Sequence, residues 1–401
     1  MFESIFRVFL KSKKFQGILI VEFAGKEFIF GEKISIDSDN FLVDEAKIKV
    51  LNKDFFKRVV LYGDTGLGES YFMNDFETPD LEKLLWWFLQ NKELLPGFRK
   101  NEPFHVFFEW GKFLLKNAHL KNRNTLEGSK KNIKAHYDVS NDFYKLWLDK
   151  TMAYSSAVFT DSLELEEGQL NKYRIICENI NLKKGDRLLE IGTGWGGFAF
   201  YAVQNYGCHV TTTTISDEQF AYVRNKINAE AQSGNIDLKL IDYRELDGMY
   251  DKIVSIEMME AIGHEYVPVF IAKLNSLLVA GGKACLQFIT YPDQYFEAYL
   301  KNTGFIKKYI FPGAELLSLG RVKKELAINK LNVGLIDSIG QDYAKTLSSW
   351  KNNFVAKKND VIRLGFSEEE FRMWLYYFVY CEVGFESGYI DDVQVTIEKN
   401  N

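Results

Sequence analysis

The chain has 401 residues, which is enough for one large domain with an ample core and a smaller second domain. Its formal net charge of −5 does not favour nucleic acid as a partner, and no apolar run reaches the roughly 18 residues that a membrane span needs. The four cysteines and five histidines are scattered without disulfide or zinc spacing, so we expect reduced thiols in a cytoplasm and no metal site. We also expect no signal peptide, because basic residues are spread through the first 16 positions, which lack an apolar centre.

The N-terminal part predicts a small α+β domain over residues 1–110. Residues 17–50 alternate apolar and polar side chains in three short runs, which predicts a meander whose first two strands form a hairpin. Helices are expected over 52–63, ending at a glycine, and over 81–89, where the apolar stripe favours core packing.

A basic stretch follows this domain. Seven lysines and arginines stand against one acid between residues 112 and 134. We interpret residues 111–134 as a linker between two domains. A solvated linker would explain the charge, and the alternative is a surface that meets anionic lipid head groups, where each nearby cation contributes about 1 kcal/mol.

Strands and helices alternate through the remainder, residues 135–401, which we take as the second domain. After a helix over 165–180, strands are expected at 187–191, 209–214, 237–242, 251–257 and 283–289, with helices at about 197–206, 217–230 and 265–278. Such alternation predicts a mostly parallel sheet with crossover helices, an α/β fold. Residues 332–338 and 389–397 are expected to add antiparallel edge strands.

One turn in this domain has the composition of a ligand-binding loop. The stretch Gly192-Thr-Gly-Trp-Gly-Gly follows a buried strand and precedes a helix, and its glycines allow positive φ and a close approach of the backbone to a nucleoside. The pattern lacks the spacing of a dinucleotide fingerprint and the lysine of a phosphate-binding loop. It resembles motif I of the S-adenosylmethionine-dependent methyltransferases, with Glu190 as the acidic residue. A glycine-rich structural turn is the alternative.

Nine stretches, in order from about residue 50 to the end, together resemble the cyclopropane fatty acid synthase family, which includes the mycolic acid cyclopropane synthases. They are Phe55-Phe-Lys-Arg-Val, Gly66-Leu-Gly-Glu-Ser-Tyr, His136-Tyr-Asp-Val-Ser-Asn-Asp-Phe-Tyr, Tyr154-Ser-Ser-Ala-Val-Phe, Gly192-Thr-Gly-Trp-Gly-Gly, Thr214-Ile-Ser-Asp-Glu-Gln, Asp242-Tyr-Arg, Glu260-Ala-Ile-Gly-His-Glu and Gly388-Tyr-Ile-Asp. The resemblance implies a Rossmann-like methyltransferase domain that uses S-adenosyl-L-methionine. The long-form bacterial members have a similar N-terminal domain and imply a homodimer.

The resemblance also implies the first cofactor contacts. Gly192 and Gly194 would let the backbone approach the methionine part of S-adenosyl-L-methionine. The usual ribose-binding carboxylate is missing, and Thr214 and Gln219 stand in its place. Their hydroxyl and amide groups can still form hydrogen bonds with ribose hydroxyls.

The remaining cofactor contacts concern the adenine and the closure of the site. Tyr243 would lie on the adenine, and Asp242 could accept its amino protons. Tyr137, Tyr154 and Ser155 resemble family positions that close over the cofactor. Ordinary aromatic packing is the alternative role for the first two.

The chemistry implied by the family needs a base. An alkene is a poor nucleophile, so the sulfonium must be held in line with it in a dry pocket. Methyl transfer leaves a carbocation that aromatic faces can stabilise, and loss of a proton from the new methyl group closes the ring. In the family a bound bicarbonate is thought to be the base, held by a glutamate, a histidine, a tyrosine, a cysteine and a main-chain contact.

Three of these positions match here, namely Glu260, Tyr343 and, for the main-chain contact, Ile289. Ser156 occupies the cysteine position and Gln287 the histidine position. Both residue types can still bind an anion. Glutamine cannot become cationic, however, so bicarbonate would bind more weakly or the product would differ.

Two further features stay open at this point. His264 follows Glu260 by four residues, which on a helix would place both on one face, so it is either a second base or a structural hydrogen-bonding group. Residues 288–317 are rich in aromatic and basic side chains and predict the wall and mouth of an acyl-chain tunnel. A helix with a core face and a surface face is the alternative.

We therefore predict S-adenosylmethionine-dependent cyclopropanation of cis double bonds in phospholipid acyl chains, by a cytoplasmic protein attached peripherally to the inner membrane surface. Within the family, the alternative is a lipid methyltransferase that gives methyl- or methylene-branched chains, because Ser156 and Gln287 depart from the usual pattern. A small-molecule methyltransferase, active without lipid, and a non-catalytic lipid-binding protein are the remaining hypotheses.

Overall fold

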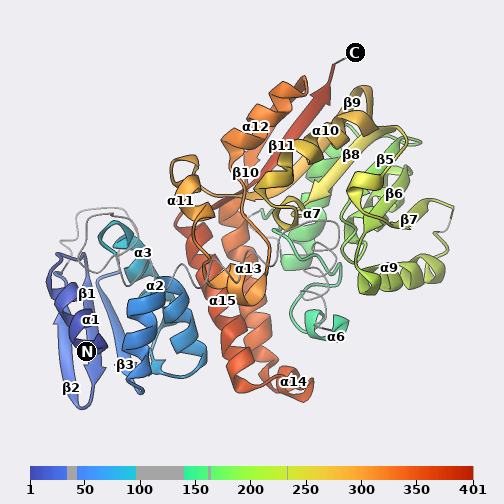
Figure 1. Ribbon diagram of the computed structural model, residues 1–401. Coiled ribbons are helices and arrows are strands. Elements are labelled where there is room, and N and C mark those ends of the chain that lie inside the picture. The colour runs from blue at the N-terminus through green and yellow to red at the C-terminus, as the bar shows by residue number, and fades with distance from the viewer. Residues whose placement is uncertain (34–42, 96–139, 161–163, 233, 401) are drawn as a thin grey trace. The chain divides into compact units, whose positions relative to one another are not determined.

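The computed structural model describes residues 1–33, 43–95, 140–160, 164–232 and 234–400. The predicted linker at 111–134 and Tyr137 lie outside these residues. The chain divides into two compact units (Figure 1), the first from Met1–Lys121, Lys301–Ile310 and Val355–Val383, and the second from Asn122–Leu300, Phe311–Phe354 and Gly384–Asn401. No helix among the described residues is both long and apolar enough to cross a membrane.

The first unit holds a four-stranded sheet in the order β2-β1-β3-β4. Strands β1 (Ile18–Phe23) and β2 (Lys26–Phe30) form the predicted antiparallel hairpin, but β3 (Glu45–Val50) pairs with β1 in parallel. The predicted meander is therefore wrong, because a parallel neighbour needs a crossing connection. The last strand, β4 (Phe76–Glu77), pairs with β3.

Helices α1 (Phe2–Lys11), α2 (Asp54–Phe72) and α3 (Leu81–Gln90) accompany this sheet, together with a short 3-10 turn at Lys92–Leu94. The label α2 covers two helices that meet at a kink, at the glycine where the sequence predicts that the first helix ends. Gly63 has φ 56° and ψ −125°, which is not helical, so the helix that starts at Asp54 stops there and a second one follows. The positive φ explains why a glycine stands there.

Two later segments belong to the first unit, which differs from the expected domain over residues 135–401. One of them, residues 301–310, includes the π-helical turn Ile306–Ile310 and packs on α2. Lys308 and the Tyr309 hydroxyl both donate to the Glu69 carboxylate, and a Cβ atom on Gly68 would lie 2.4 Å from the Phe305 ring. The other segment, residues 355–383, contains α14 (Lys358–Arg363) and most of α15 (Glu368–Glu386).

The second unit is built on a seven-stranded sheet in the order β10-β11-β9-β8-β5-β6-β7. The first five strands of this sheet along the chain, β5 to β9, pair in parallel. At one edge β11 pairs antiparallel with both β9 and β10, as predicted. The strands are β5 (Arg187–Ile191), β6 (His209–Thr214), β7 (Ile236–Leu240), β8 (Tyr250–Ile256), β9 (Leu278–Thr290), β10 (Leu331–Ser338) and β11 (Asp391–Lys399).

Helices cover both faces of this sheet because alternate strand residues point to opposite sides. Leu188 belongs to a core with helices α7, α8 and α9, whereas Leu189 belongs to a second core with α10 and α12. The helices are α6 (Asn141–Tyr144), α7 (Leu165–Asn179), α8 (Gly197–Tyr206), α9 (Asp217–Ala229), α10 (Val267–Leu277), α11 (Phe296–Leu300), α12 (Leu319–Ile328) and α13 (Gly340–Ala356).

One local expectation fails between β8 and α10. Glu260 and His264 do not share a helix, because they lie on two separate 3-10 turns, Met259–Ala261 and His264–Tyr266. Gly263 stands between the turns with φ 78°, which breaks helical geometry. His264 instead pairs with Glu315 through its Nδ1 atom, at 2.6 Å.

Candidate active site

The glycine turn lies at the carboxyl end of β5, the edge where open α/β sheets bind ligands. Gly192 and Gly194 have φ values of 100° and 51°. A Cβ atom on Gly192 would lie 3.0 Å from the Met258 side chain, whereas one on Gly194 would meet no atom within 4 Å. The backbone of Gly194 therefore borders open space, which is the arrangement that a closely approaching ligand requires.

Glu190, the acid of the glycine motif, lies inside the sheet and faces β6. Its Oε2 accepts a hydrogen bond of 2.5 Å from the Thr212 hydroxyl, and only 2% of the residue is exposed. Burial raises the pKa of Glu190 to about 8. At pH 7 the Glu190 carboxyl group is therefore mainly protonated, and its hydrogen bond with Thr212 joins β5 to β6.

Thr214 and Gln219 meet where β6 ends and α9 begins. The Thr214 hydroxyl donates to Gln219 Oε1 at 2.8 Å and accepts from the Ser216 backbone at 3.1 Å. Within the described residues the side-chain nitrogen of Gln219 has no partner, so its two hydrogens remain for a ligand. The two predicted ribose contacts are therefore adjacent.

Asp242 and Tyr243 follow β7, but their side chains have partners of their own. The Asp242 carboxylate accepts three hydrogen bonds from Arg244, through its backbone nitrogen, Nε and Nη2. The Tyr243 ring packs edge-on against Phe270, with centroids 5.3 Å apart, and is 6% exposed. Its buried hydroxyl has no partner among the described residues, and burial raises its pKa to about 12.

Tyr154 and Ser155 lie in different surroundings. Tyr154 belongs to an aromatic cluster, with its ring centroid 5.2 Å from that of Trp147 and 5.3 Å from that of Trp350. The Ser155 hydroxyl accepts a hydrogen bond of 2.5 Å from Lys172 Nζ. Lys172 is fully buried on α7, and burial lowers its pKa to about 8.

Two of the five residues expected to hold the base meet at the end of β9. Glu260 Oε1 accepts a hydrogen bond of 2.6 Å from the backbone nitrogen of Ile289. Its other oxygen is buried without a partner among the described residues. Burial, together with the nearby charge of Glu257, raises the pKa of Glu260 to about 8. This carboxyl group is mainly protonated at neutral pH.

The other three residues contact Glu257, which was not predicted. Glu257 Oε1 accepts hydrogen bonds from the Ser156 backbone nitrogen at 2.7 Å and from Gln287 Nε2 at 2.8 Å. Its Oε2 accepts from the Tyr343 hydroxyl at 2.7 Å. The Ser156 hydroxyl itself donates to the Ala157 carbonyl, away from Glu257.

The position of Glu257 in the sequence could have marked it as a candidate site residue. It is the first residue after the parallel strand β8, at the same sheet edge as the glycine turn. Its φ of 47° is unusual for a residue with a side chain. Strained backbone of this kind gathers at functional sites.

Gln287 extends the network to the C-terminal strand. Its Nε2 also donates to Asp392 Oδ2 at 2.8 Å, and its Oε1 accepts from Gln394 Nε2 at 3.1 Å. Asp392 is fully buried, and burial together with the charge of Glu257 raises its pKa well above the usual range. Burial also raises the pKa of Glu257, whereas the charge of Lys172 and the hydrogen bond from Tyr343 lower it.

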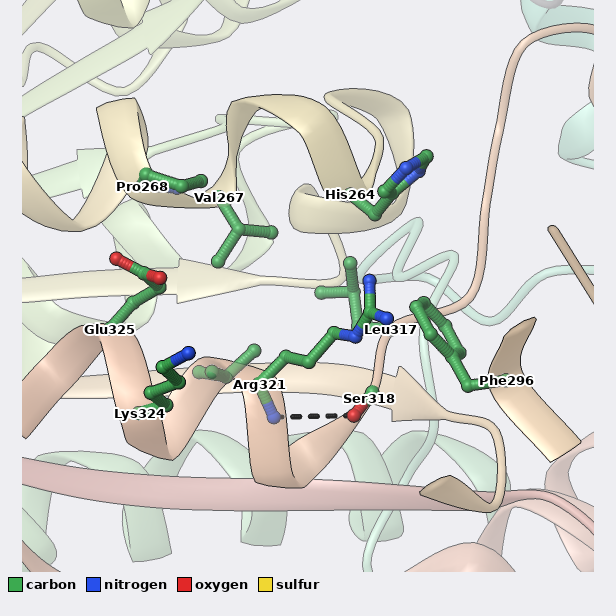
Figure 2. A pocket seen from close by; sticks show the side chains of 10 residues that line it. His264, Val267, Pro268, Phe296, Leu317, Ser318, Arg321, Lys324 and Glu325 are labelled. Atoms are coloured by element: carbon green, nitrogen blue, oxygen red, sulfur yellow. Dashed lines mark hydrogen bonds between the residues drawn. The ribbon is translucent and has the colours of Figure 1, made fainter. Parts of the chain in front are cut away.

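A pocket of about 300 Å³ lies elsewhere in the second unit, between α10 and α12 (Figure 2). Its lining combines apolar side chains with the basic groups of His264, Arg321 and Lys324 and the acid Glu325. The Ser318 hydroxyl caps α12 by accepting from the Arg321 backbone, as the dashed line in Figure 2 marks. None of the predicted site residues lines this pocket.

Comparison with known proteins relates this arrangement to characterised enzymes. Residues 124–395 match the family model described as Mycolic acid cyclopropane synthetase. The chain is 33% identical over 365 residues to the tuberculostearic acid methyltransferase UfaA1 of Mycobacterium tuberculosis, covering 85% of this chain and 80% of that protein. It is also 33% identical over 359 residues to the cyclopropane-fatty-acyl-phospholipid synthase of Escherichia coli K12, covering 88% of each.

Among solved structures, the chain resembles the mycolic acid cyclopropane synthase CmaA1, whose crystal structure is a complex with SAH and CTAB. The TM-score is 0.63 at 34% sequence identity, and the match covers 67% of this chain and 98% of that one.

Proposed function

Because the chain belongs to the mycolic acid cyclopropane synthetase family of S-adenosylmethionine-dependent methyltransferases, we propose that it methylates cis double bonds in phospholipid acyl chains and closes them to cyclopropanes. The observation that carries this proposal is a near-full-length similarity to the Escherichia coli phospholipid synthase, together with a cluster of carboxyl groups beside the glycine turn. The reaction on the membrane phospholipid would make this a peripheral enzyme of the membrane surface.

The residues around the turn fit S-adenosyl-L-methionine, which supplies an electrophilic methyl group when bound. The open space beside Gly194 admits a ligand against the backbone, and the free amide hydrogens of Gln219 suit ribose hydroxyls. Asp242 retains room for one more donor, because a carboxylate accepts about four hydrogen bonds and Arg244 provides three. Tyr243 offers the adenine little exposed ring surface, so its role there remains a prediction.

The aromatic cluster of the second unit suits a reaction that passes through a carbocation. The rings of Tyr154, Trp147 and Trp350 pack at centroid distances between 5.2 and 5.5 Å. Tyr343 stacks on Phe385 at 4.3 Å. The electron-rich faces of such rings stabilise positive charge when water is excluded.

The pocket between α10 and α12 supports a lipid with an anionic head group as the substrate. Apolar side chains such as Val267, Phe296 and Leu317 line it beside three basic groups (Figure 2). Phe296 and Leu317 belong to the segment predicted to form the acyl-chain tunnel. An apolar wall beside Arg321 and Lys324, with one acid, Glu325, would suit a molecule that has an acyl chain and a phosphate.

A second product remains a candidate. The similar UfaA1 protein is named a methyltransferase of tuberculostearic acid and not a cyclopropane synthase, and Gln287 and Ser156 occupy positions where the ring-forming pattern has other residues. These observations support a methyl- or methylene-branched chain as the alternative product.

Mass spectrometry and proton NMR of the lipid distinguish these functions. The enzyme is mixed with S-adenosyl-L-methionine and vesicles of cis-monounsaturated phosphatidylglycerol. A gain of one CH2 with cyclopropane ring protons is the expected result, and a gain without ring protons would establish the branched product. Unchanged lipid in the presence of bound cofactor would contradict the proposal.

A further inference from the structure

The hydrogen-bond donors that would hold a bicarbonate are used by a side chain of the protein. The Tyr343 hydroxyl, the Gln287 amide and the Ser156 backbone nitrogen all donate to Glu257, at 2.7 to 2.8 Å. Bicarbonate presents flat, anionic carboxylate-like oxygens, and Glu257 presents two such oxygens to the same donors. The site as built therefore does not fit a separate bicarbonate ion.

The placement of Glu257 is maintained against conformational strain. Its φ of 47° lies in the left-handed region, which is unfavourable for a residue with a Cβ atom. Three hydrogen bonds to the carboxylate and one from its backbone nitrogen to the Gln287 carbonyl, at 2.8 Å, hold it there. A residue kept in this conformation by so many contacts is positioned by the fold.

Glu257 is also the least buried carboxyl group of the network. The residue is partly exposed, whereas Gln287, Asp392 and Lys172 are fully buried. Glu260 is nearly buried, with one oxygen on the Ile289 backbone. Of these carboxyl groups, Glu257 is therefore the one that combines partial exposure with three hydrogen-bond donors.

The groups that face Glu257 favour its ionised form. Lys172 contributes positive charge from α7, and the Tyr343 hydroxyl of α13 stabilises the anion by hydrogen bonding. These contacts oppose the rise in the pKa of Glu257 that burial causes. Burial raises the pKa of Asp392 on β11 and of Glu260, and neither carboxyl group receives the three donors that converge on Glu257.

We propose that Glu257 is the base of the second step of the proposed reaction, and that this enzyme works without bicarbonate. A C–H bond of the transferred methyl group breaks, its electron pair forms the ring-closing bond to the cationic carbon, and the proton goes to the Glu257 carboxylate. The resulting neutral acid returns its proton to water from its partly exposed position. The inference rests on the proposed function, and a branched product would require the same base for a methylene group.

The decisive experiment measures initial rates of lipid methylation in carbonate-free buffer under argon, with and without added bicarbonate. The wild-type rate is expected to agree within about twofold between the two conditions. A rate that falls tenfold or more without bicarbonate, and recovers when it is added, would overturn the inference and leave the proposed function intact. Absence of any lipid product in both conditions would instead refute the proposed function.

Variants test the residue itself. Glu257→Gln is expected to lose about 100-fold or more in turnover, the usual contribution of a general base, while S-adenosyl-L-methionine binding measured by calorimetry is retained. The matched control is Glu369→Gln on an exposed position of α15, with unchanged turnover. A folded Glu257→Gln enzyme with turnover within threefold of wild type would also overturn the inference. If that variant does not fold, the wild-type comparison alone decides.

Discussion

The Nε2 atom of Gln287 lies 2.8 Å from Asp392 Oδ2 and donates a hydrogen bond to it, joining β9 to the neighbouring β11. The same nitrogen donates to Glu257, also at 2.8 Å. One neutral amide thus supplies a hydrogen to each of two carboxyl groups. The family pattern has a histidine at this position, which could carry a positive charge. A neutral glutamine can replace it here because Lys172 already supplies positive charge to Glu257.

Replacement of this amide is expected to destabilise the protein. Gln287→Leu keeps most of the volume but leaves Glu257 and Asp392 without their shared donor. Buried polar groups without partners lower the free energy of unfolding by about 2–4 kcal/mol here, which urea denaturation measures. The control is Gln204→Leu, at an exposed position of α8. It should change the free energy of unfolding by less than about 0.5 kcal/mol. Equal stability of the two variants would contradict the network.

Glu260→Gln is expected to reduce turnover sharply while cofactor binding survives. The Glu260 side chain contacts the Ile289 backbone and none of the predicted cofactor residues. Its amide replacement can still accept that hydrogen bond, so the fold should persist. Because Glu260 positions the Ile289 backbone and is not the proposed base, we expect the loss, about 100-fold in kcat, to come from misplaced reacting groups, with an unchanged dissociation constant for S-adenosyl-L-methionine. Turnover close to wild type would show that Glu260 has no part in the reaction.

Gly194→Ala is expected to weaken cofactor binding. The new methyl group would enter the open space beside the turn and take room that the ligand needs. Calorimetry should show a loss of affinity of about tenfold or more, with a stability cost of about 1–2 kcal/mol from the positive φ. Gly185→Ala is the matched control, since Gly185 also has positive φ and open surroundings but lies before β5. It should lose stability and keep affinity; equal affinity of both variants would refute the site.

Glu190 predicts a specific dependence of stability on pH. Burial raises its pKa to about 8 in the folded protein, from an ordinary value of 4.5. Between these values the folded state holds a proton that the unfolded state has released, so a rise in pH favours unfolding. The stabilisation is complete below pH 4.5 and is lost as the pH rises through 8.

The variant Glu190→Gln removes this titration but can still accept the hydrogen bond from Thr212. Its free energy of unfolding should therefore fall less between pH 5 and pH 8 than that of the wild type. Denaturant titrations at the two pH values measure the difference. Parallel pH curves for the two proteins would contradict the buried, protonated state of Glu190.

Much of the second unit could be predicted because each of its strands, turns and helices is indicated by a short run of neighbouring residues. Runs such as Leu188–Ile191 and the glycines after them predict strand, turn and helix without reference to the rest of the chain. Glu257 could not be assigned in this way. Its partners Ser156, Gln287 and Tyr343 are distant in sequence, and only the folded chain brings their donors to one carboxylate.

The first unit shows the same limit. The sequence predicts the end of a helix at Gly63, where the backbone does leave helical geometry, but it does not predict the second helix that follows directly within α2. Two other features depend on contacts between distant segments. They are the pairing of β3 with β1 and the hydrogen bonds from Lys308 and Tyr309 to Glu69. The hydrophobic periodicity of the sequence and the composition of its turns do not indicate which distant segments will pair.

The fate of an isotopic label tests the central claim most directly. The enzyme is given S-adenosyl-L-methionine with a CD3 group and vesicles of cis-monounsaturated phosphatidylglycerol, and the acyl chains are analysed by mass spectrometry and NMR. The account predicts a cyclopropane whose bridging carbon keeps two deuterium atoms, since the base removes one from the transferred methyl group. A product that retains the intact CD3 group would contradict it, because no proton would have left that carbon.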